Sequence, residues 1–365
     1  MPEGLHRRAF LLHGGRAALG MALLPQLGNG ATASKATDSL EAVTADLTRQ
    51  LPGLMAEMAV PGVSIAIIRN GALAWRQGFG VSDAASKSPV DTDTIFEAAS
   101  TSKPVFAYAV MKLCEKGLLG LDTPLVEYGA APFLEGDERI ARITARHVLS
   151  HTTGFQNWRS DDEPLKIHFT PGEKYQYSGE GFSYLQSVVT TVTRQPIEPF
   201  MKAQLFDPFA MTSGGYEWNA MFEARAARPH DIKGRPQSNR KRTAADVARF
   251  AAAGDLHCTP TDYAKFLLEV IAPKPADAFR LSHDSLREMR RPQVKSSEWH
   301  SRGLGWEIVQ GDAGDIIQHG GDNLGFRCFA AASVEHRFGM VVMTNGDNGG
   351  PLMGKFFSST LQRLR

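Results

Sequence analysis

The stretch that decides how this chain folds and reacts is Phe96-Glu97-Ala98-Ala99-Ser100-Thr101-Ser102-Lys103. Apolar residues at helical spacing follow it over 105–113, and Gly117 is placed as a C-cap. Ser100 therefore opens a predicted helix, and Lys103 shares its face because it lies three residues later. A serine hydroxyl needs a base to remove its proton, and a lysine can be that base where burial or nearby positive charge lowers its pKa. We predict Ser100 as a nucleophile and Lys103 as its base.

A second Ser-x-x-Lys occurs at Ser238-Asn239-Arg240-Lys241. It lies in the polar run 233–242, which lacks the apolar periodicity of an amphipathic helix. We therefore interpret this run as a solvated loop and assign the second copy no catalytic role.

A tyrosine motif follows the turn at Pro171-Gly172 and delivers Tyr177 just before a helical pattern at 182–193. A tyrosine that a nearby ammonium keeps ionised is a competent proton shuttle, and Tyr177 is the candidate for this role. Tyr175 is the alternative, two residues earlier. A purely structural role as loop anchors is the alternative for both tyrosines.

The third motif is Gln318-His319-Gly320-Gly321, at the end of a short predicted strand. Two glycines there are typical of a strand edge where a substrate backbone comes close. We expect His319 to donate a hydrogen bond across the site, beside Gly320 and Gly321. The motif is weak by itself, because His13-Gly14-Gly15 repeats it.

The order of predicted elements favours an α/β (α+β) fold with one antiparallel sheet built from both chain ends and flanked by helices. Near the start, Asn70-Gly71 separates apolar runs at 63–67 and 72–81, which is a strong hairpin signal. The strand pattern returns after Gly303, and the expected strands are 304–309, 315–318, 326–332 and 340–344. The flanking helices are expected at 40–58 and 352–364, around a mostly helical middle region from about 120 to 290.

Taken in this order, the serine-lysine, tyrosine and His-x-Gly motifs resemble the serine β-lactamase and penicillin-recognising enzyme superfamily, in its class C-like branch of esterases and peptidases. The resemblance spans roughly residues 40 to 364, and further matching stretches are 149–154, 206–211, 303–306 and 344–346. It implies a β-lactamase/transpeptidase-like fold and no cofactor. It also implies an acyl-enzyme on Ser100, proton transfer by Lys103 and Tyr177, and an oxyanion held by backbone N–H groups near Ser100 and Gly321.

Two departures from the family pattern concern the substrate. Class C β-lactamases and penicillin-binding proteins carry Asn two residues after the motif tyrosine, where its amide contacts the acylamino side chain of the substrate. This chain has Gly179 at that position. The third motif is His-Gly-Gly where β-lactamases usually have Lys-Thr-Gly. Both changes remove groups that hold a β-lactam or a D-alanyl peptide, and both leave acyl transfer intact.

Asp322 follows the third motif directly. A carboxylate that faces the substrate there repels the carboxylate of β-lactams and D-alanyl peptides, so neutral esters or amine-bearing amides are the expected substrates. The alternatives are that Asp322 caps the turn at 323–325, or that Arg327 neutralises it.

The composition is that of a globular protein, with 365 residues, 42% of them hydrophobic and 22% charged. Forty Lys and Arg against 39 Asp and Glu leave a formal charge of +1, which makes nucleic acid an unexpected partner. Cys114, Cys258 and Cys328 lack a metal-binding spacing and are expected to be buried free thiols. The 11 histidines offer no compact ligand set, so no metal is expected.

Residues 1–33 are predicted to be an export signal that resembles the twin-arginine type. Arg7-Arg8 precede the apolar stretch 17–27, and Ala31-Thr32-Ala33 supplies small residues before a cleavage site. An amphipathic first helix is the alternative. No apolar run reaches the roughly 18 residues of a membrane span, and no cysteine follows as a lipid acceptor. After cleavage of the signal, the mature protein is expected to be periplasmic or secreted, with one catalytic domain over 37–365.

The leading function is hydrolysis of a small-molecule ester or amide, and two others stay open. One is a β-lactamase or D-amino-acid peptidase, and the other is a penicillin-binding sensor module that is acylated without turnover. A Ser-His-Asp enzyme is not favoured, because no serine lies in a Gly-x-Ser-x-Gly context. His151 is accordingly expected to be structural.

Overall fold

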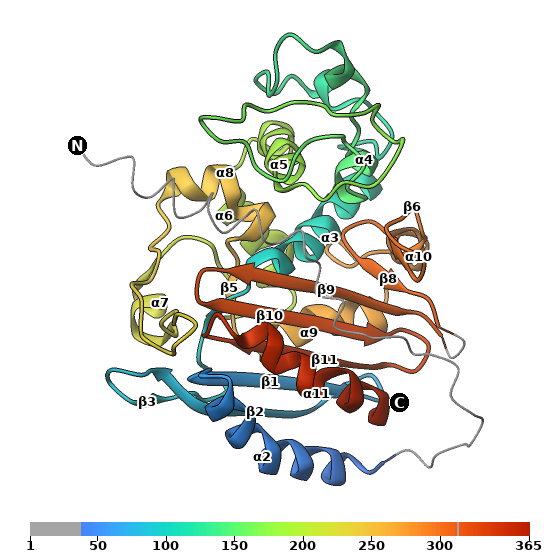
Figure 1. Cartoon of the computed structure of the whole chain (residues 1–365). Helices are drawn as coiled ribbons and strands as arrows, with labels where there is room; N and C mark the ends of the chain where they lie inside the picture. Colours follow the sequence, from blue (N-terminus) through green and yellow to red (C-terminus); the bar gives the residue numbers. More distant parts are fainter. Residues whose placement is uncertain (1–37, 312–313) are drawn as a thin grey trace.

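The computed structural model describes residues 38–311 and 314–365, and its dominant element is an antiparallel sheet (Figure 1). The nine strands run in the order β3-β2-β1-β11-β10-β9-β8-β7-β6. They are β1 (Gly62–Arg69), β2 (Ala72–Asp83), β3 (Ser88–Pro89), β6 (Val294–Lys295), β7 (His300–Arg302), β8 (Glu307–Val309), β9 (Ile316–Asn323), β10 (Phe326–Ser333) and β11 (Phe338–Thr344). Because β1 pairs with β11, both ends of the chain meet within one sheet, and the predicted α/β (α+β) fold is confirmed.

The β1–β2 hairpin follows from the two residues at its turn. Asn70 and Gly71 have φ angles of 53° and 72°, which a two-residue turn with left-handed central residues requires. Asparagine and glycine adopt this conformation at little cost. The strands on either side pair antiparallel, as the Asn-Gly signal predicts.

Helices cover both faces of the sheet (Figure 1). They are α2 (Leu40–Glu57), α3 (Ser102–Glu115), α9 (Pro260–Ile271) and α11 (Gly349–Arg363). Alternate residues of β1 serve two apolar cores: Val63 and Ile65 join the core that contains α2 and α11, whereas Ala66 and Ile68 join the core of α3 and α9. The sheet is therefore buried on both sides, and α3 lies on the face opposite α2 and α11.

The middle of the chain is mostly helical, as expected, and much of it lies above the sheet in the view of Figure 1. Its α-helices are α4 (Ala145–Leu149), α5 (Gly179–Thr193), α6 (Ile197–Met201), α7 (Ala220–Arg225), α8 (Ala244–Gly254) and α10 (His283–Arg290). The short helical turns are η1 (Ala99–Thr101), η2 (Leu125–Tyr128), η3 (Glu138–Arg142) and η4 (Lys202–Phe206). A separate ladder of β4 (Phe96–Glu97) and β5 (His257–Cys258) connects the middle region to the stretch that carries Ser100.

One sequence-based interpretation is wrong. The polar run 233–242 is not solvated throughout, because the Arg242 side chain is only 8% exposed and pairs with Asp255 and Glu97. Glu97 is 145 residues away in sequence, which is why local polarity could not indicate this burial.

Several other sequence-based expectations bear on the surface and the termini. The predicted export signal at 1–33 lies outside the described residues. Within the part that the structure describes, no helix is long and apolar enough to cross a membrane.

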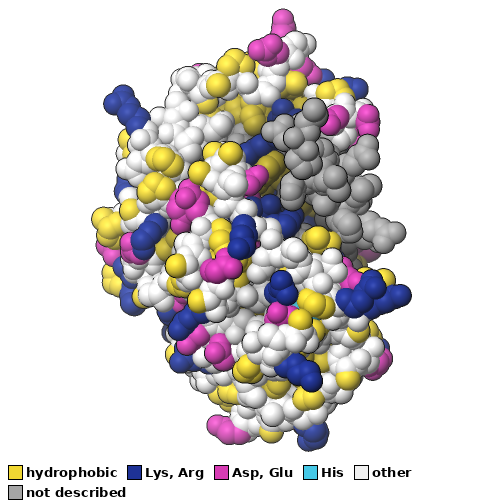
Figure 2. All heavy atoms as spheres, turned by 90° about the vertical axis from the view of Figure 1, so that its left-hand side faces the viewer, with side chains coloured by type: hydrophobic (Ala, Val, Ile, Leu, Met, Phe, Trp, Pro, Cys, Tyr) yellow, Lys and Arg dark blue, Asp and Glu magenta, His cyan; other side chains and the backbone are white. Residues whose placement is uncertain are grey.

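Figure 2 shows acidic and basic side chains interspersed over one face of the molecule. The three cysteines are free thiols; Cys258 and Cys328 are buried as expected, whereas Cys114 is only partly buried.

Candidate active site

Ser100 lies in η1, between the short strand β4 and the long helix α3. Ala99 immediately before it has a φ of 51°, a left-handed conformation that costs a non-glycine residue roughly 1 kcal/mol or more. Ala99 is completely buried, whereas Ser100 is partly exposed. The strained turn therefore holds the serine side chain at the surface of an otherwise closed core.

Lys103 reaches Ser100 from the first turn of α3. Its Nζ lies 3.1 Å from Ser100 Oγ and donates a hydrogen bond of 2.5 Å to the carbonyl oxygen of Ala253 in α8. The lysine is 1% exposed. Burial lowers the pKa of Lys103 to about 7, and the positive charge of Arg302 acts in the same direction, whereas Asp255 opposes both. A substantial fraction of Lys103 is therefore neutral near pH 7 and able to accept a proton.

Tyr177 lies two residues before α5, and its hydroxyl is hydrogen-bonded to Ser100. Burial raises the pKa of Tyr177 to about 12, although Ser100 and Arg302 favour the ionised form. Tyr177 is therefore a neutral phenol at pH 7. The prediction that a nearby ammonium keeps this tyrosine ionised is not supported. Lys103 Nζ lies 4.9 Å from the centre of its ring. Tyr175 instead packs against Arg302, whose guanidinium carbon lies 5.0 Å from the centre of the Tyr175 ring.

His151 positions Tyr177. The two rings stack at 4.2 Å with an interplanar angle of 26°, and the Nδ1 atom of His151 accepts a hydrogen bond from the backbone N–H of Ser178. Burial holds the pKa of His151 well below its usual range, so the ring is neutral. His151 contacts the tyrosine loop, which agrees with its expected structural role.

Strand β9 brings the third motif to Ser100. A Cβ atom on Gly321 would lie 2.5 Å from the carbonyl oxygen of Ala98 and 3.2 Å from the backbone N of Ser100, so only glycine fits this approach. The backbone of β9 at Gly321 thus runs directly beside the backbone N of Ser100. Gly320 is next to it in β9, with its Cα facing the ring of Phe329 on the other side of the strand.

His319 lies on the same side of β9 as Gly321, with its ring 6.3 Å from that of Tyr177. Its Nδ1 lies 2.7 Å from the carbonyl oxygen of Gly320, which can only accept a hydrogen bond, so Nδ1 carries the hydrogen. Burial keeps the pKa of His319 well below its usual range, and Lys103 and Arg302 reinforce the effect. The buried Nε2 has no partner among the described residues and presents a lone pair. In this tautomer the free nitrogen of His319 is an acceptor, which differs from the expected donor role.

A buried ion network behind Ser100 was not predicted from the sequence. Glu97 in β4 pairs with Arg240 at 2.5 Å and Arg242 at 3.3 Å, and Arg242 also pairs with Asp255 at 2.5 Å. The side chain of Asn323 in β9 donates to Glu97 as well. Despite burial, the two arginines hold the pKa of Glu97 below its ordinary value. The network joins β4, the 240–242 loop, the end of α8 and β9, which are the segments that surround Ser100.

Arg302 of β7 is a second residue that sequence reasoning missed. It forms an ion pair of 2.8 Å with Glu307 and lies over Tyr175. Its charge lowers the pKa of Lys103 and favours the ionised form of Tyr177. In the sequence, only the stretch 303–306 that follows it matches the family pattern.

These three motifs converge as the family resemblance implies, and a comparison with known families agrees. A family model described as Beta-lactamase matches residues 47–355. The chain belongs to the Beta-lactamase family. Among curated relatives of this Beta-lactamase family member, Esterase EstB of Burkholderia gladioli is 29% identical over 222 residues, which cover 52% of the chain and 55% of the esterase. The putative penicillin-binding protein PbpX of Bacillus subtilis (strain 168) is 24% identical over 294 residues, covering 77% of the chain and 70% of PbpX.

Solved structures show the same fold. The octameric penicillin-binding protein homologue from Pyrococcus abyssi superposes with a TM-score of 0.74 at 23% identity, covering 87% of this chain and 77% of that one. The β-lactamase/D-alanine carboxypeptidase from Pseudomonas syringae gives 0.74 at 19% identity, covering 88% and 98%. At these identities the comparison concerns the fold alone.

Asp322 and Gly179 are the two remaining residues that were predicted to bind the substrate, and neither lies as expected. Asp322 is on the opposite side of β9 from Gly321, and its carboxylate pairs with Arg327 at 3.0 Å. The structure therefore contradicts a repulsion between Asp322 and a substrate carboxylate, because strand alternation turns the side chain away from Ser100. Gly179 begins α5, where the indole ring of Trp158 occupies the space beside its Cα.

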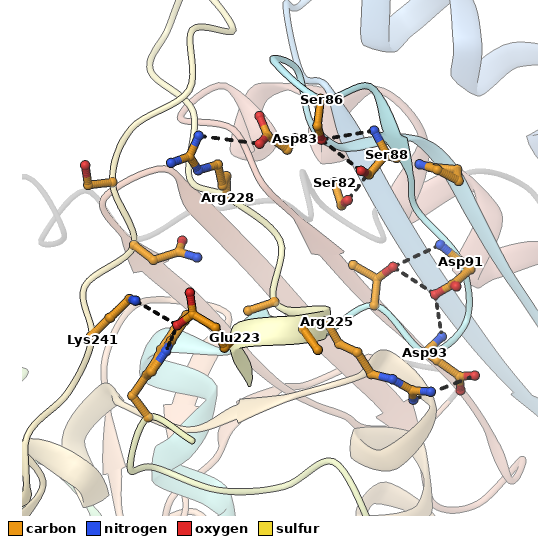
Figure 3. A pocket seen from close by; sticks show the side chains of 17 residues that line it. Ser82, Asp83, Ser86, Ser88, Asp91, Asp93, Glu223, Arg225, Arg228 and Lys241 are labelled. Carbon is orange, nitrogen blue, oxygen red and sulfur yellow. Dashed lines mark hydrogen bonds and ion pairs between the residues drawn. The ribbon is translucent and has the colours of Figure 1, made fainter. Parts of the chain in front are cut away.

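The second Ser-x-x-Lys lines a separate, open pocket of about 530 Å³ (Figure 3). There Lys241 pairs with Glu223 at 2.7 Å, and Arg228 pairs with Asp83 at 3.4 Å. Ser238 is exposed, and no group of three or more His, Cys, Asp or Glu side chains that could hold a metal occurs in the described part of the chain. Lys241 is thus engaged with a carboxylate and lacks the burial that lowers the pKa of Lys103.

Proposed function

We propose that this protein is a serine hydrolase that cleaves neutral esters or amides through an acyl-enzyme on Ser100. The observation that carries the proposal is the 3.1 Å contact between Ser100 Oγ and the amine of a completely buried Lys103. Burial supplies the neutral amine that a hydroxyl nucleophile requires. The similarity to Esterase EstB supports the reaction class.

In acylation, Ser100 Oγ attacks the carbonyl carbon while its proton moves to Lys103 Nζ. Backbone N–H groups at Ser100 and beside Gly321 stabilise the oxyanion. The bond to the leaving group then breaks, and the leaving oxygen or nitrogen takes the hydroxyl proton of Tyr177. Lys103 is then an ammonium and Tyr177 a tyrosinate, and these opposite charges stabilise each other.

In deacylation, a water molecule attacks the acyl carbon and gives its proton to the tyrosinate of Tyr177. The bond between the acyl carbon and Ser100 Oγ breaks, and Oγ recovers a proton from the Lys103 ammonium. The three side chains return to their starting states, so the cycle needs no cofactor.

The preference for neutral substrates rests on His319. Its Nε2 carries a lone pair at the position where the family pattern has a lysine, and a lone pair attracts an N–H or O–H group of the substrate, not a carboxylate. Arg302 is already paired with Glu307 and adds no isolated positive charge. Esters or amides that carry a hydrogen-bond donor therefore match the site better than carboxylate-bearing lactams.

The test combines labelling and turnover. A fluorophosphonate probe, read by intact mass, is applied to the wild type, Ser100→Ala and the matched control Ser238→Ala, followed by assays on p-nitrophenyl acetate and nitrocefin. We expect labelling and ester turnover in the wild type and Ser238→Ala, and neither in Ser100→Ala. Labelling without turnover would favour the sensor, faster nitrocefin hydrolysis would favour a β-lactamase, and labelling that depends on Ser238 would refute the site.

A further inference from the structure

Strand β9 has a free edge in the part that passes Ser100. It pairs with β10 over residues 316–323, but with β8 only over 316–318. From His319 to Asn323, its other edge therefore has no strand partner among the described residues. Gly321, whose backbone runs beside Ser100, lies in this part of the strand. Because ladder hydrogen bonds hold it from one side only, another contact must set how closely it approaches Ser100.

The side chain of Asn323 supplies such a contact. Its Nδ2 donates a hydrogen bond of 3.0 Å to the carbonyl oxygen of Gly254, the last residue of α8. It also donates to the carboxylate of Glu97 in β4. An amide nitrogen carries two hydrogens, so both are used. One side chain thus fixes the end of β9 against two separate elements.

Both acceptors belong to backbone that holds the reacting groups. Glu97 is three residues before Ser100 in the same segment. A Cβ atom on Gly254 would lie 3.9 Å from the backbone N of Ser100, so the end of α8 also passes beside the serine. The carbonyl oxygen of Ala253, one residue before Gly254, accepts the hydrogen bond from Lys103. Asn323 therefore connects β9 to the same segments that position Ser100 and Lys103.

An amide side chain matches the chemistry of these two acceptors. The carboxylate of Glu97 is only 3% exposed, and the arginines beside it hold its pKa below the ordinary value. A second carboxylate at position 323 would repel it, and an apolar side chain would leave the carbonyl oxygen of Gly254 without this donor. Arg240 and Arg242 also pair with Glu97 but come from the 240–242 loop, so they do not hold β9.

We propose that Asn323 is a positioning residue for oxyanion binding; this rests on the proposed function. It holds β9 at the distance from Ser100 at which an N–H group of β9 and the N–H of Ser100 bind the same oxygen. Asn323 acts through the backbone of β9 and not by contact with the reacting atoms. The oxyanion exists only while the carbonyl carbon is tetrahedral, so loss of this alignment lowers kcat and leaves substrate binding largely unchanged.

The test compares the wild type with Asn323→Leu, which has a similar size but no donor, and with the matched control Asn348→Leu. The amide of Asn348 also donates two hydrogen bonds, but to the carbonyl oxygens of Met58 and Ile232 and not to the segments beside Ser100. Urea unfolding gives the stability of each variant. kcat and KM are measured for p-nitrophenyl acetate and for its thiono analogue, in which sulfur replaces the carbonyl oxygen.

We expect Asn323→Leu to lower kcat for p-nitrophenyl acetate about tenfold or more, with KM within about threefold of the wild type. Sulfur accepts hydrogen bonds more weakly than oxygen, so the preference of the wild type for the oxygen ester should fall at least about threefold in Asn323→Leu. Asn348→Leu should keep kcat and this preference, even at an equal loss of stability.

An unchanged oxygen-to-sulfur preference in Asn323→Leu would overturn the proposal, because a purely structural role does not act on the oxyanion. An equal fall of the preference in Asn348→Leu, or a loss of activity confined to KM, would overturn it as well. If Asn323→Leu does not fold, Asn323→Ser, which keeps one donor, decides by the same preference.

Failure of the proposed function appears in the wild type, whereas failure of this inference appears only in the comparison of variants. A wild type that the fluorophosphonate probe does not label refutes the Ser100 hydrolase, and the role of Asn323 with it. If the wild type is labelled but does not turn over, the labelling rate replaces kcat as the readout. Equal labelling rates in the wild type and Asn323→Leu would then refute the role of Asn323 alone.

Discussion

Lys103, the proposed base, opposes the stability of the fold that positions it. Its pKa falls from 10.5 to about 7 on folding, chiefly because of burial. Between these two pH values the unfolded chain binds a proton that the folded chain lacks, so stability rises with pH across this window. The penalty is therefore complete at and below pH 7 and fades towards pH 10.5.

Because the lower pKa of Lys103 in the folded chain costs stability, we expect Lys103→Met to be inactive and more stable than the wild type. The pKa change corresponds to at most about 5 kcal/mol, and the lost hydrogen bonds to Ser100 and Ala253 reduce the gain to roughly 2–4 kcal/mol at pH 7. Urea unfolding at pH 7 and pH 9 measures it, and the gain should be about 2 kcal/mol smaller at pH 9. A gain that does not depend on pH would contradict the assignment, and Lys355→Met, at an exposed position of α11, is the control.

Arg302 adds to the effect of burial in lowering the pH at which Lys103 becomes neutral. Because Lys103 must be neutral, kcat/KM for a neutral ester should rise with pH to a plateau above about 7. Removing the charge in Arg302→Gln raises the pKa of Lys103, so the midpoint should move up by about half to one pH unit. Arg302→Lys keeps the charge and should keep the midpoint. A pH–rate profile in which both variants shift equally would mean that Arg302 acts by packing.

His319 is predicted to decide between neutral and anionic substrates. In His319→Lys an ammonium replaces the Nε2 lone pair, so carboxylate-bearing substrates should gain relative to neutral ones by about tenfold. The readout is the ratio of kcat/KM for benzylpenicillin and p-nitrophenyl acetate, with His319→Gln as the uncharged control. An unchanged ratio in the lysine variant would show that position 319 does not contact the carboxylate.

At the scale of elements, the network around Arg242 holds four segments in register. Removing one partner of a buried ion pair leaves an uncompensated charge, at a cost of about 3–5 kcal/mol. Arg242→Met should therefore destabilise the protein by that amount and reduce the labelling rate of Ser100. The double variant Arg242→Met/Asp255→Leu should recover part of the stability, because the orphaned carboxylate is gone. Thermal unfolding with fluorophosphonate labelling tests both, and a double variant no more stable than the single one would exclude this network account.

The elements that the sequence predicts well depend on neighbouring residues. The Asn70-Gly71 hairpin and the helix after Ser100 follow from backbone preferences and apolar periodicity over a few residues. Strand β9 was expected to end at Gln318, whereas it continues to Asn323 because β10 pairs with it along its whole length. That pairing carries His319 and Gly321 into the site, and local pattern alone does not reveal it.

The site could be predicted as a set of motifs but not as an electrostatic arrangement. The spacing of Ser100 and Lys103 indicates their contact, which the structure shows at 3.1 Å. By contrast, the roles of Arg242 and Arg302 depend on partners that only the fold brings near. The tautomer of His319 depends on a 2.7 Å contact with the adjacent carbonyl, which sequence spacing does not encode.

At the scale of the whole molecule, the sheet is closed by strands from opposite ends of the chain. Strand β1 pairs with β11, and α2 and α11 share one apolar core. The pairing joins residues more than 270 positions apart, so its loop-closure entropy leads us to expect that it forms late in folding. The active-site segments between them are therefore held by a frame that forms only when the whole chain is present.

The ion pair of Asp38 with Arg363 places the two ends of the described chain side by side. They can consequently be joined by a short Gly-Ser linker, and the chain opened instead at the exposed Glu135-Gly136 turn. This circular permutant makes β11 and β1 neighbours along the chain, turning their distant pairing into a local one. We expect it to fold faster in stopped-flow refolding and to label at Ser100 at the wild-type rate. Unchanged refolding kinetics would show that closure of the sheet does not limit folding.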